Sequence, residues 1–227
     1  MSAFALGVIA SIIGSAVFAL VSAYFASRFR KQVTAVLSAL LGTGVEAVYS
    51  NEEEAASDLV QYARASQTVC ILNMRAFSLL DERRPLHFLL RSDQRVDRTV
   101  RILISDPNSP AVDARAGEIS AVEPTYNLDR YRANITDSVR VLTGLACGNS
   151  RLSVRLSTAF PAFGLMLTDD AVFVSFFLAD KIRSHAPQYR IGRASPLYRG
   201  FQRYFETLWQ EGGPAELVAA RAEQAAI

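Results

Sequence analysis

Two short clusters of polar residues in this chain combine a serine, a proline and nearby arginines. The first, Asp106-Pro-Asn-Ser-Pro110, directly follows the apolar run 99–104. The second, Ser195-Pro196, follows a predicted loop with glycine and arginine residues, Arg190-Ile-Gly-Arg193. Serine before proline is typical of a helix that begins with a capping serine and has proline at its first position. A helix that begins at a strand end directs its backbone N–H groups toward one point, which suits an anion such as a phosphate.

Arginine side chains supply the second part of such a site, because a planar guanidinium can hold two oxygens of one phosphate group. We therefore expect a binding site for a small phosphorylated ligand, nucleotides included, near the strand ends. Two other interpretations remain open: the serines only cap helices, or Asp106 and Arg115 form a structural ion pair. The candidate ligand-binding residues are Arg75, Asp106, Ser109, Arg115, Arg193 and Ser195.

Composition limits the other kinds of site. The net charge is only +2, with both signs mixed along the 227 residues, so we expect no large basic field and no bulk nucleic-acid binding. The chain has two cysteines, Cys70 and Cys147, and two histidines, which form no cluster of the kind that binds zinc. We expect no metal site, no cofactor and reduced thiols.

The residues after 43 alternate apolar runs of strand length with helical patterns. This alternation, with an antiparallel hairpin at one end, predicts an α/β sandwich with a mixed sheet. The turn of that hairpin is Asp169-Asp170. The predicted strands are 45–49, 68–72, 99–104, 152–156, 164–168 and 172–177. One predicted helix begins directly after Asn51, and the others are 85–90, 110–122, 125–146 and 197–210.

The segment 1–27 contains no charged residue and is followed by Arg28, Arg30 and Lys31. About 20 apolar residues in a helix cross the hydrocarbon core of a membrane. The basic residues follow the apolar run, which indicates a retained anchor rather than a signal peptide and places the rest of the chain in the cytoplasm. We expect a single-pass inner-membrane protein. Its parts are the transmembrane helix 1–27, a basic juxtamembrane linker 28–43, a cytosolic domain 44–210 and a tail 211–227.

Small residues recur along one face of this predicted membrane helix. In lipid, helices associate through close backbone packing along such faces, so we expect a homo-oligomer. The alternative is that small residues are simply common in membrane helices. The predicted contact residues are Gly7, Ser11, Gly14 and Ser15.

Three segments carry a family resemblance. Residues 44–55 read Gly-Val-Glu-Ala-Val-Tyr-Ser-Asn-Glu-Glu-Glu-Ala, residues 65–72 read Ala-Ser-Gln-Thr-Val-Cys-Ile-Leu, and residues 100–110 read Val-Arg-Ile-Leu-Ile-Ser-Asp-Pro-Asn-Ser-Pro. This order, with the closing Tyr204-Phe-Glu-Thr-Leu-Trp209, resembles a bacterial group of phospholipase-D-like domains over about 44–210. The resemblance implies an α/β/α sandwich that commonly dimerises, and many similar domains look like sensors rather than enzymes.

The catalytic motif of that superfamily is His-x-Lys-x4-Asp, in which histidine attacks phosphorus and lysine holds the phosphate oxygens. The motif usually lies in the strand hairpin, so its aspartate should be Asp169 or Asp170. Counting back from Asp169 places Ala162 at the histidine position and Gly164 at the lysine position, and counting back from Asp170 gives no match either. Neither histidine of the chain, His87 or His185, has lysine and aspartate at the required offsets. We therefore expect no catalytic residue of this type.

These patterns together predict a membrane-anchored, non-catalytic phospholipase-D-like sensor or effector. It would bind a small phosphorylated signal or a partner and act through its oligomeric membrane helix. One span joined to one binding domain suits bacterial stress or phage-defence signalling. Two alternatives remain: a membrane-bound phosphodiesterase or lipid-modifying enzyme with an unrecognised site, and a membrane scaffold for partner proteins.

Overall fold

A computed structural model describes residues 42–84, 86–91, 97–123, 127–159, 161–177 and 186–215. The predicted membrane helix, with Gly7, Ser11, Gly14 and Ser15, lies outside these residues, as do most of the linker and the tail beyond residue 215. Within the described part of the chain, no helix is both long enough and apolar enough to span a membrane.

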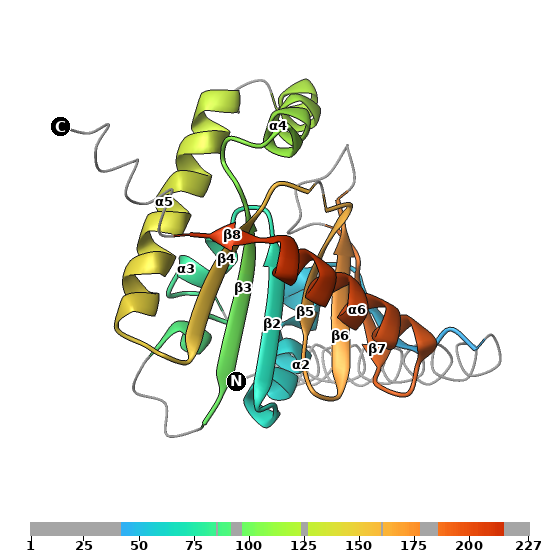
Figure 1. Cartoon of the computed structure of the whole chain (residues 1–227). Coiled ribbons are helices and arrows are strands. Elements are labelled where there is room, and N and C mark those ends of the chain that lie inside the picture. Colours follow the sequence, from blue (N-terminus) through green and yellow to red (C-terminus); the bar gives the residue numbers. More distant parts are fainter. Residues whose placement is uncertain are drawn as a thin grey trace, which may run out of the picture.

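An eight-stranded mixed sheet forms the centre of the structure, in the order β1-β7-β6-β5-β2-β3-β4-β8 (Figure 1). This agrees with the predicted mixed α/β class. The strands are β1 (Val45–Tyr49), β2 (Thr68–Asn73), β3 (Thr99–Ser105), β4 (Leu152–Ser157), β5 (Phe163–Leu167), β6 (Ala171–Phe176), β7 (Gln188–Gly192) and β8 (Gly213–Pro214). The helices are α2 (Glu52–Ala65), α3 (Phe77–Leu80), α4 (Pro110–Val122), α5 (Leu128–Cys147) and α6 (Pro196–Glu211), with a 3-10 helix at His87–Leu90.

One half of the sheet is parallel. Ile71 of β2 pairs with Ile102 of β3, which pairs with Val154 of β4. All three side chains point to the same face and are buried there. Runs of β-branched residues of this kind are typical of parallel strands enclosed by helices.

The other half is antiparallel. β5 and β6 form the predicted hairpin, in which the Thr168 N–H donates to the Ala171 carbonyl across the Asp169-Asp170 turn. The prediction that this hairpin lies at one end of the sheet is wrong, because β5 pairs with β2 while β7 and β1 extend the sheet beyond β6. The segment Arg190–Arg193, which the sequence analysis treated as a loop, belongs largely to β7.

Helices cover the two faces of the sheet unequally. The first face packs against α2, α4 and α5 through side chains such as Leu59, Val112 and Ile135. The second face, which we call the α6 face, packs against α6 through a cluster that includes Phe205 and Trp209. In Figure 1, α6 crosses in front of β5 and β6 and leaves the lower parts of β3 and β4 in view.

Local sequence signals set most helix ends. The Asn51 side chain accepts a hydrogen bond from the Glu54 N–H at the start of α2, and Asn127 accepts one from the Arg130 N–H at the start of α5. The helix expected over 85–90 is instead the single 3-10 turn His87–Leu90.

Candidate functional site

The direction of the strands gives the sheet two unlike edges. β2, β3 and β4 are parallel, so they all end at one edge, which we call the carboxyl edge. β6 also ends there, whereas β5 and β7 begin there because they are antiparallel to their neighbours. The opposite edge, the amino edge, holds the Asp169-Asp170 turn and the start of α6. In Figure 1 the carboxyl edge lies at the top, under α4.

Helix α4 begins at the carboxyl edge, directly after β3. The Asp106 carboxylate accepts a hydrogen bond from the Asn108 N–H at 2.9 Å, and the Asp106 carbonyl accepts one from the Ser109 N–H at 3.0 Å. Ser109 stands at the N-cap position but its side chain makes no capping hydrogen bond. The residue is only 2% exposed, and its hydroxyl has no hydrogen-bond partner among the described residues.

Arg115 lies further along α4 and is only 3% exposed. Its Nη1 atom lies 2.6 Å from the Glu118 carboxylate, and its guanidinium carbon lies 5.4 Å from the ring centroid of Phe177, which follows β6. The ion pair is therefore with Glu118 and not with Asp106, the partner considered from the sequence. Because Phe177 comes from the other half of the sheet, Arg115 reaches across the carboxyl edge.

Arg75 lies at the same edge, two residues after β2. Its N–H donates to the Asn73 side-chain oxygen at 3.2 Å, and its guanidinium carbon lies 5.3 Å from the ring centroid of Tyr131 on α5. Arg75, Asp106, Ser109 and Arg115 thus share the edge at which the sequence analysis placed a ligand. Whether they bind one remains a prediction.

The structure separates the other two candidates from this group. Arg193 and Ser195 follow β7, which runs toward the amino edge, so they lie at the opposite end of the sheet. The Ser195 hydroxyl accepts from the Leu197 N–H at 3.0 Å and donates to the Thr43 carbonyl at 2.7 Å, so it caps α6. The Arg193 side chain is 70% exposed and lies 3.9 Å from the Asp170 carboxylate. Two of the six candidates thus lie away from the other four, and whether any of the six binds a ligand remains a prediction.

The positions at which the catalytic motif of the resembled phospholipase D superfamily was sought, Ala162 and Gly164, contain no nucleophile. Ala162 is exposed just before β5, and its carbonyl accepts from the Phe177 N–H at 3.0 Å. Gly164 is buried opposite Ser175 of β6. Asp169 accepts hydrogen bonds from the Gln67 and Thr68 N–H groups and so ties the hairpin turn to the start of β2. His87 contacts the Leu79 carbonyl, whereas His185 lies outside the described residues.

A buried polar cluster that the sequence analysis missed lies just inside the carboxyl edge. Glu52, Asn73 and Gln188 line a cavity of about 20 Å³, roughly the space of one water molecule. The Gln188 Nε2 atom and the hydroxyl of its strand neighbour Ser175 have no hydrogen-bond partner among the described residues. Ser175 could have been noticed as a polar residue inside the run 171–176, but Gln188 belongs to the strand that was not predicted.

The described residues contain no group of side chains arranged to hold a metal ion. Among the residues that the structure describes, no three His, Cys, Asp or Glu side chains come together in such a group. The chemistry that the edge offers is a helix N-terminus, a buried hydroxyl and guanidinium groups. Such donors suit an anionic ligand.

No family model and no curated protein matches the chain. The solved structures that are similar to it include the following two. TrmBL2, an archaeal chromatin protein whose structure shows a novel mode of DNA binding, is 15% identical, with a TM-score of 0.45 over 92% of this chain and 70% of its own. Nuc from Salmonella typhimurium, a phospholipase D family member, is 14% identical, with a TM-score of 0.40 over 74% of this chain and 97% of its own.

The first of these structures corrects one prediction. The low net charge led us to expect no bulk nucleic-acid binding, whereas a DNA-binding chromatin protein is among the structures similar to this chain. That exclusion was wrong and is withdrawn.

Proposed function

We propose that this chain is a membrane-anchored, non-catalytic sensor or effector that binds a small phosphorylated molecule at the carboxyl edge. The observation that carries the proposal is the start of α4, where Ser109 is buried and its hydroxyl has no partner among the described residues. A buried polar group without a partner is costly, and a bound ligand oxygen would satisfy it. The positive end of the α4 dipole favours a negatively charged ligand at the same point.

Arg115 supplies the cation for such a ligand. Its side chain is almost fully enclosed, whereas the Glu118 side chain that it contacts is 41% exposed. Glu118 can therefore turn toward solvent when a phosphate takes its place on the guanidinium. Arginine suits this exchange because its planar fork can bind two phosphate oxygens at once.

Two features favour binding over hydrolysis. Ala162 and Gly164, at the positions of the motif histidine and lysine, provide neither a nucleophile nor a positive charge. The cavity lined by Asn73 and Gln188, just inside the carboxyl edge, has a volume of about 20 Å³, far too small for a phosphodiester. A phosphate can therefore dock at the edge, where the described residues do not place the motif's histidine and lysine beside it.

The membrane part of the proposal rests on the sequence. The uncharged segment 1–27 and the basic residues that follow it would anchor the chain in the inner membrane with the described domain in the cytoplasm. Ligand binding would then act through an oligomer of these helices, in a stress or phage-defence response.

The proposal can be tested on the full chain in detergent micelles. Titration calorimetry with inorganic phosphate, pyrophosphate and a nucleoside monophosphate should show saturable binding of at least one, without hydrolysis of a phosphodiester substrate. Arg115→Ala should weaken this binding about ten- to a hundredfold, because a charge-assisted hydrogen bond contributes roughly 1.5–3 kcal/mol. Arg193→Ala, at the amino edge, is the control and should bind as the parent does.

A thermal melt of unliganded Arg115→Ala separates loss of binding from loss of folding. If the variant folds and binds normally, or if Arg193→Ala is the variant that loses binding, the site at the carboxyl edge is wrong. Turnover of a phosphodiester by the parent protein would contradict the non-catalytic part of the proposal.

A further inference from the structure

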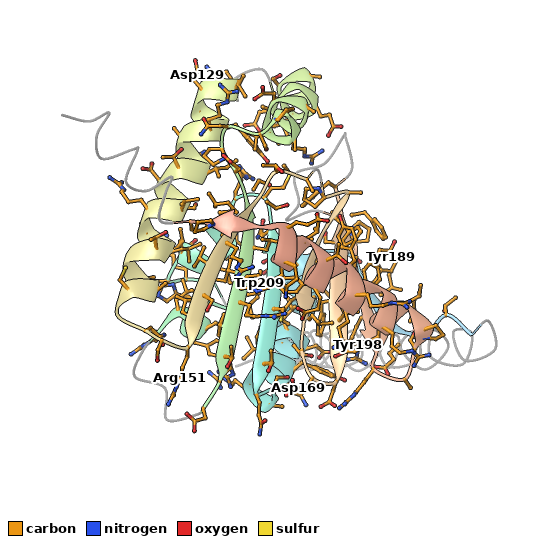
Figure 2. The ribbon with its side chains drawn as sticks, viewed as in Figure 1. Asp129, Arg151, Asp169, Tyr189, Tyr198 and Trp209 are labelled. Carbon is orange, nitrogen blue, oxygen red and sulfur yellow. The ribbon has the colours of Figure 1, made fainter. Side chains whose placement is uncertain are left out.

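A larger concave site lies on the α6 face, near the amino edge and away from the site described above. It has a volume of about 370 Å³ and is bounded by the first residues of β2 and β3, the end of β5 and one side of α6. Figure 2 shows two of its lining residues, Tyr198 on α6 and Asp169 in the turn below it. The polar side chains that matter for its chemistry are Thr68, Thr99, Arg101, Asp169, Gln202 and Glu206.

The charged groups of this pocket are held in place by the protein itself. Asp169 Oδ2 accepts a hydrogen bond from the Gln67 N–H at 2.7 Å. The Arg101 Nη1 atom donates to Glu206 at 3.1 Å. The Arg101 guanidinium carbon also lies 5.0 Å from the ring centroid of Trp209. A ligand would therefore meet an ordered polar surface and would lose little affinity to reorganisation.

The lining residues include both hydrogen-bond donors and hydrogen-bond acceptors, and they carry no strong excess of charge. It contains one guanidinium and two carboxylates, and each is engaged with a protein group. The Arg101 Nε atom is buried and has no hydrogen-bond partner within the described ranges. Burial raises the pKa of the Cys70 thiol on the pocket floor, so that group is uncharged at neutral pH.

We propose that this pocket binds a neutral small molecule rich in hydroxyl groups, a polyol. A hydroxyl group can accept from an Arg101 Nη N–H that is not donated to Glu206, and it can donate to an unused lone pair of Asp169 or Glu206. A phosphate would be repelled by the Asp169 carboxylate, whereas an ammonium ion would gain little, because the Arg101 guanidinium offsets one of the two carboxylates. The threonine hydroxyls and the Gln202 amide complete the set of neutral partners. The inference does not rest on the proposed function at the carboxyl edge.

The single tryptophan of the chain is a local reporter for this pocket. Trp209 stacks on Arg101, so a ligand that contacts Arg101 should change the fluorescence of this only tryptophan. The full chain is titrated with myo-inositol and with ribose, and in parallel with inorganic phosphate and with lysine. We expect a saturable change with a neutral polyol and none with the two charged probes.

Two glutamines on α6 give a matched pair of variants, because both are exposed but only Gln202 lines the pocket. Gln202→Ala should weaken polyol binding about three- to tenfold, the worth of one or two neutral hydrogen bonds, while Gln210→Ala should leave it unchanged. Thr99→Val, which keeps the shape of the side chain, should weaken it similarly. The proposal is overturned if no neutral polyol gives a saturable change, if phosphate or lysine gives the larger one, or if all three variants behave alike.

Discussion

The Nη1 atom of Arg190 on β7 lies 2.5 Å from the Oδ2 atom of Asp58 on α2. The hydroxyl of Tyr49 on β1 donates to the same carboxylate, and Glu46 lies 3.3 Å from the Arg190 Nε atom. Both side chains of the Arg190–Asp58 pair are 17% exposed. The pair therefore fixes α2 against the two outermost antiparallel strands.

Asp58→Ala should lower the free energy of unfolding by about 2–3 kcal/mol, because it removes the nearer of the two carboxylates that contact a largely buried guanidinium. Asp137→Ala is the control, since its ion pair with Arg140 is mostly exposed. That change should cost less than about 1 kcal/mol. Urea unfolding of the two variants measures the difference, and equal losses would show that the Arg190–Asp58 pair contributes no more than a surface ion pair.

Stability should fall at alkaline pH, in part because of Tyr49. Burial, and then the hydrogen bond to Asp58, raise the pKa of Tyr49 above its ordinary value. The unfolded chain loses the Tyr49 proton near pH 10, while the folded chain still holds it. The contribution of Tyr49 to the free energy of unfolding is therefore fully present below about pH 10 and is lost as the pH rises further. Each such proton accounts for up to about 1.4 kcal/mol per pH unit.

Tyr49→Phe should therefore lose stability less steeply than the parent between about pH 10 and 12, although it is less stable at neutral pH. Urea unfolding at a series of pH values measures both slopes. Burial also raises the pKa values of Tyr198 and Tyr204, so a shallower slope is expected rather than a flat one. Identical slopes for variant and parent would show that Tyr49 does not titrate differently in the folded state.

The two Ser-Pro helix starts should respond differently to the same change. Ser195 caps α6 through its side chain, so Ser195→Ala should cost about 1 kcal/mol of stability. Ser109 makes no capping hydrogen bond, so Ser109→Ala should cost almost nothing, or even stabilise the unliganded chain. Chemical denaturation of both variants tests this contrast. A loss of about 1 kcal/mol in Ser109→Ala would mean that its hydroxyl has a partner in the unliganded protein.

Gly42 and Gly44 provide a second contrast. Both have positive φ, 67° and 71°, but a Cβ atom at Gly44 would come within 2.2 Å of the Ser195 Cβ atom, while one at Gly42 would meet nothing within 4 Å. Gly42→Ala should cost about 1 kcal/mol from backbone strain alone. Gly44→Ala should cost about 2–4 kcal/mol, because the overlap adds to the strain. Thermal melts of the two variants separate these contributions.

Most of the sheet could be predicted from the sequence, because its strands are either continuous apolar runs or a hairpin around Asp169-Asp170. β7 could not, since Gln188-Tyr-Arg-Ile-Gly192 mixes polar residues with a glycine. Arg190 can lie largely buried in this strand because Asp58 of α2 gives it a partner. Such partners come from distant parts of the chain and leave no local pattern.

The candidate site was predicted in part for a related reason. Asp106, Ser109 and Arg115 follow a parallel strand, and the sequence analysis correctly expected them at a strand end. Ser195 also follows a strand, but that strand is antiparallel, so its carboxyl end points to the opposite edge. Whether two strand ends meet depends on the relative direction of the strands, which a local pattern does not contain.

The pairing of β1 with β7 also constrains the order in which the chain can fold. The parallel half of the sheet uses one continuous stretch, residues 68–157, whereas Val45 of β1 pairs with Ile191 of β7. Closing so long a loop is entropically costly unless the intervening strands have already formed. On the ribosome, β1 is made before every other described strand, yet it must wait for β7 before it gains a strand neighbour. The first described strand to be synthesised is thus among the last to enter the sheet.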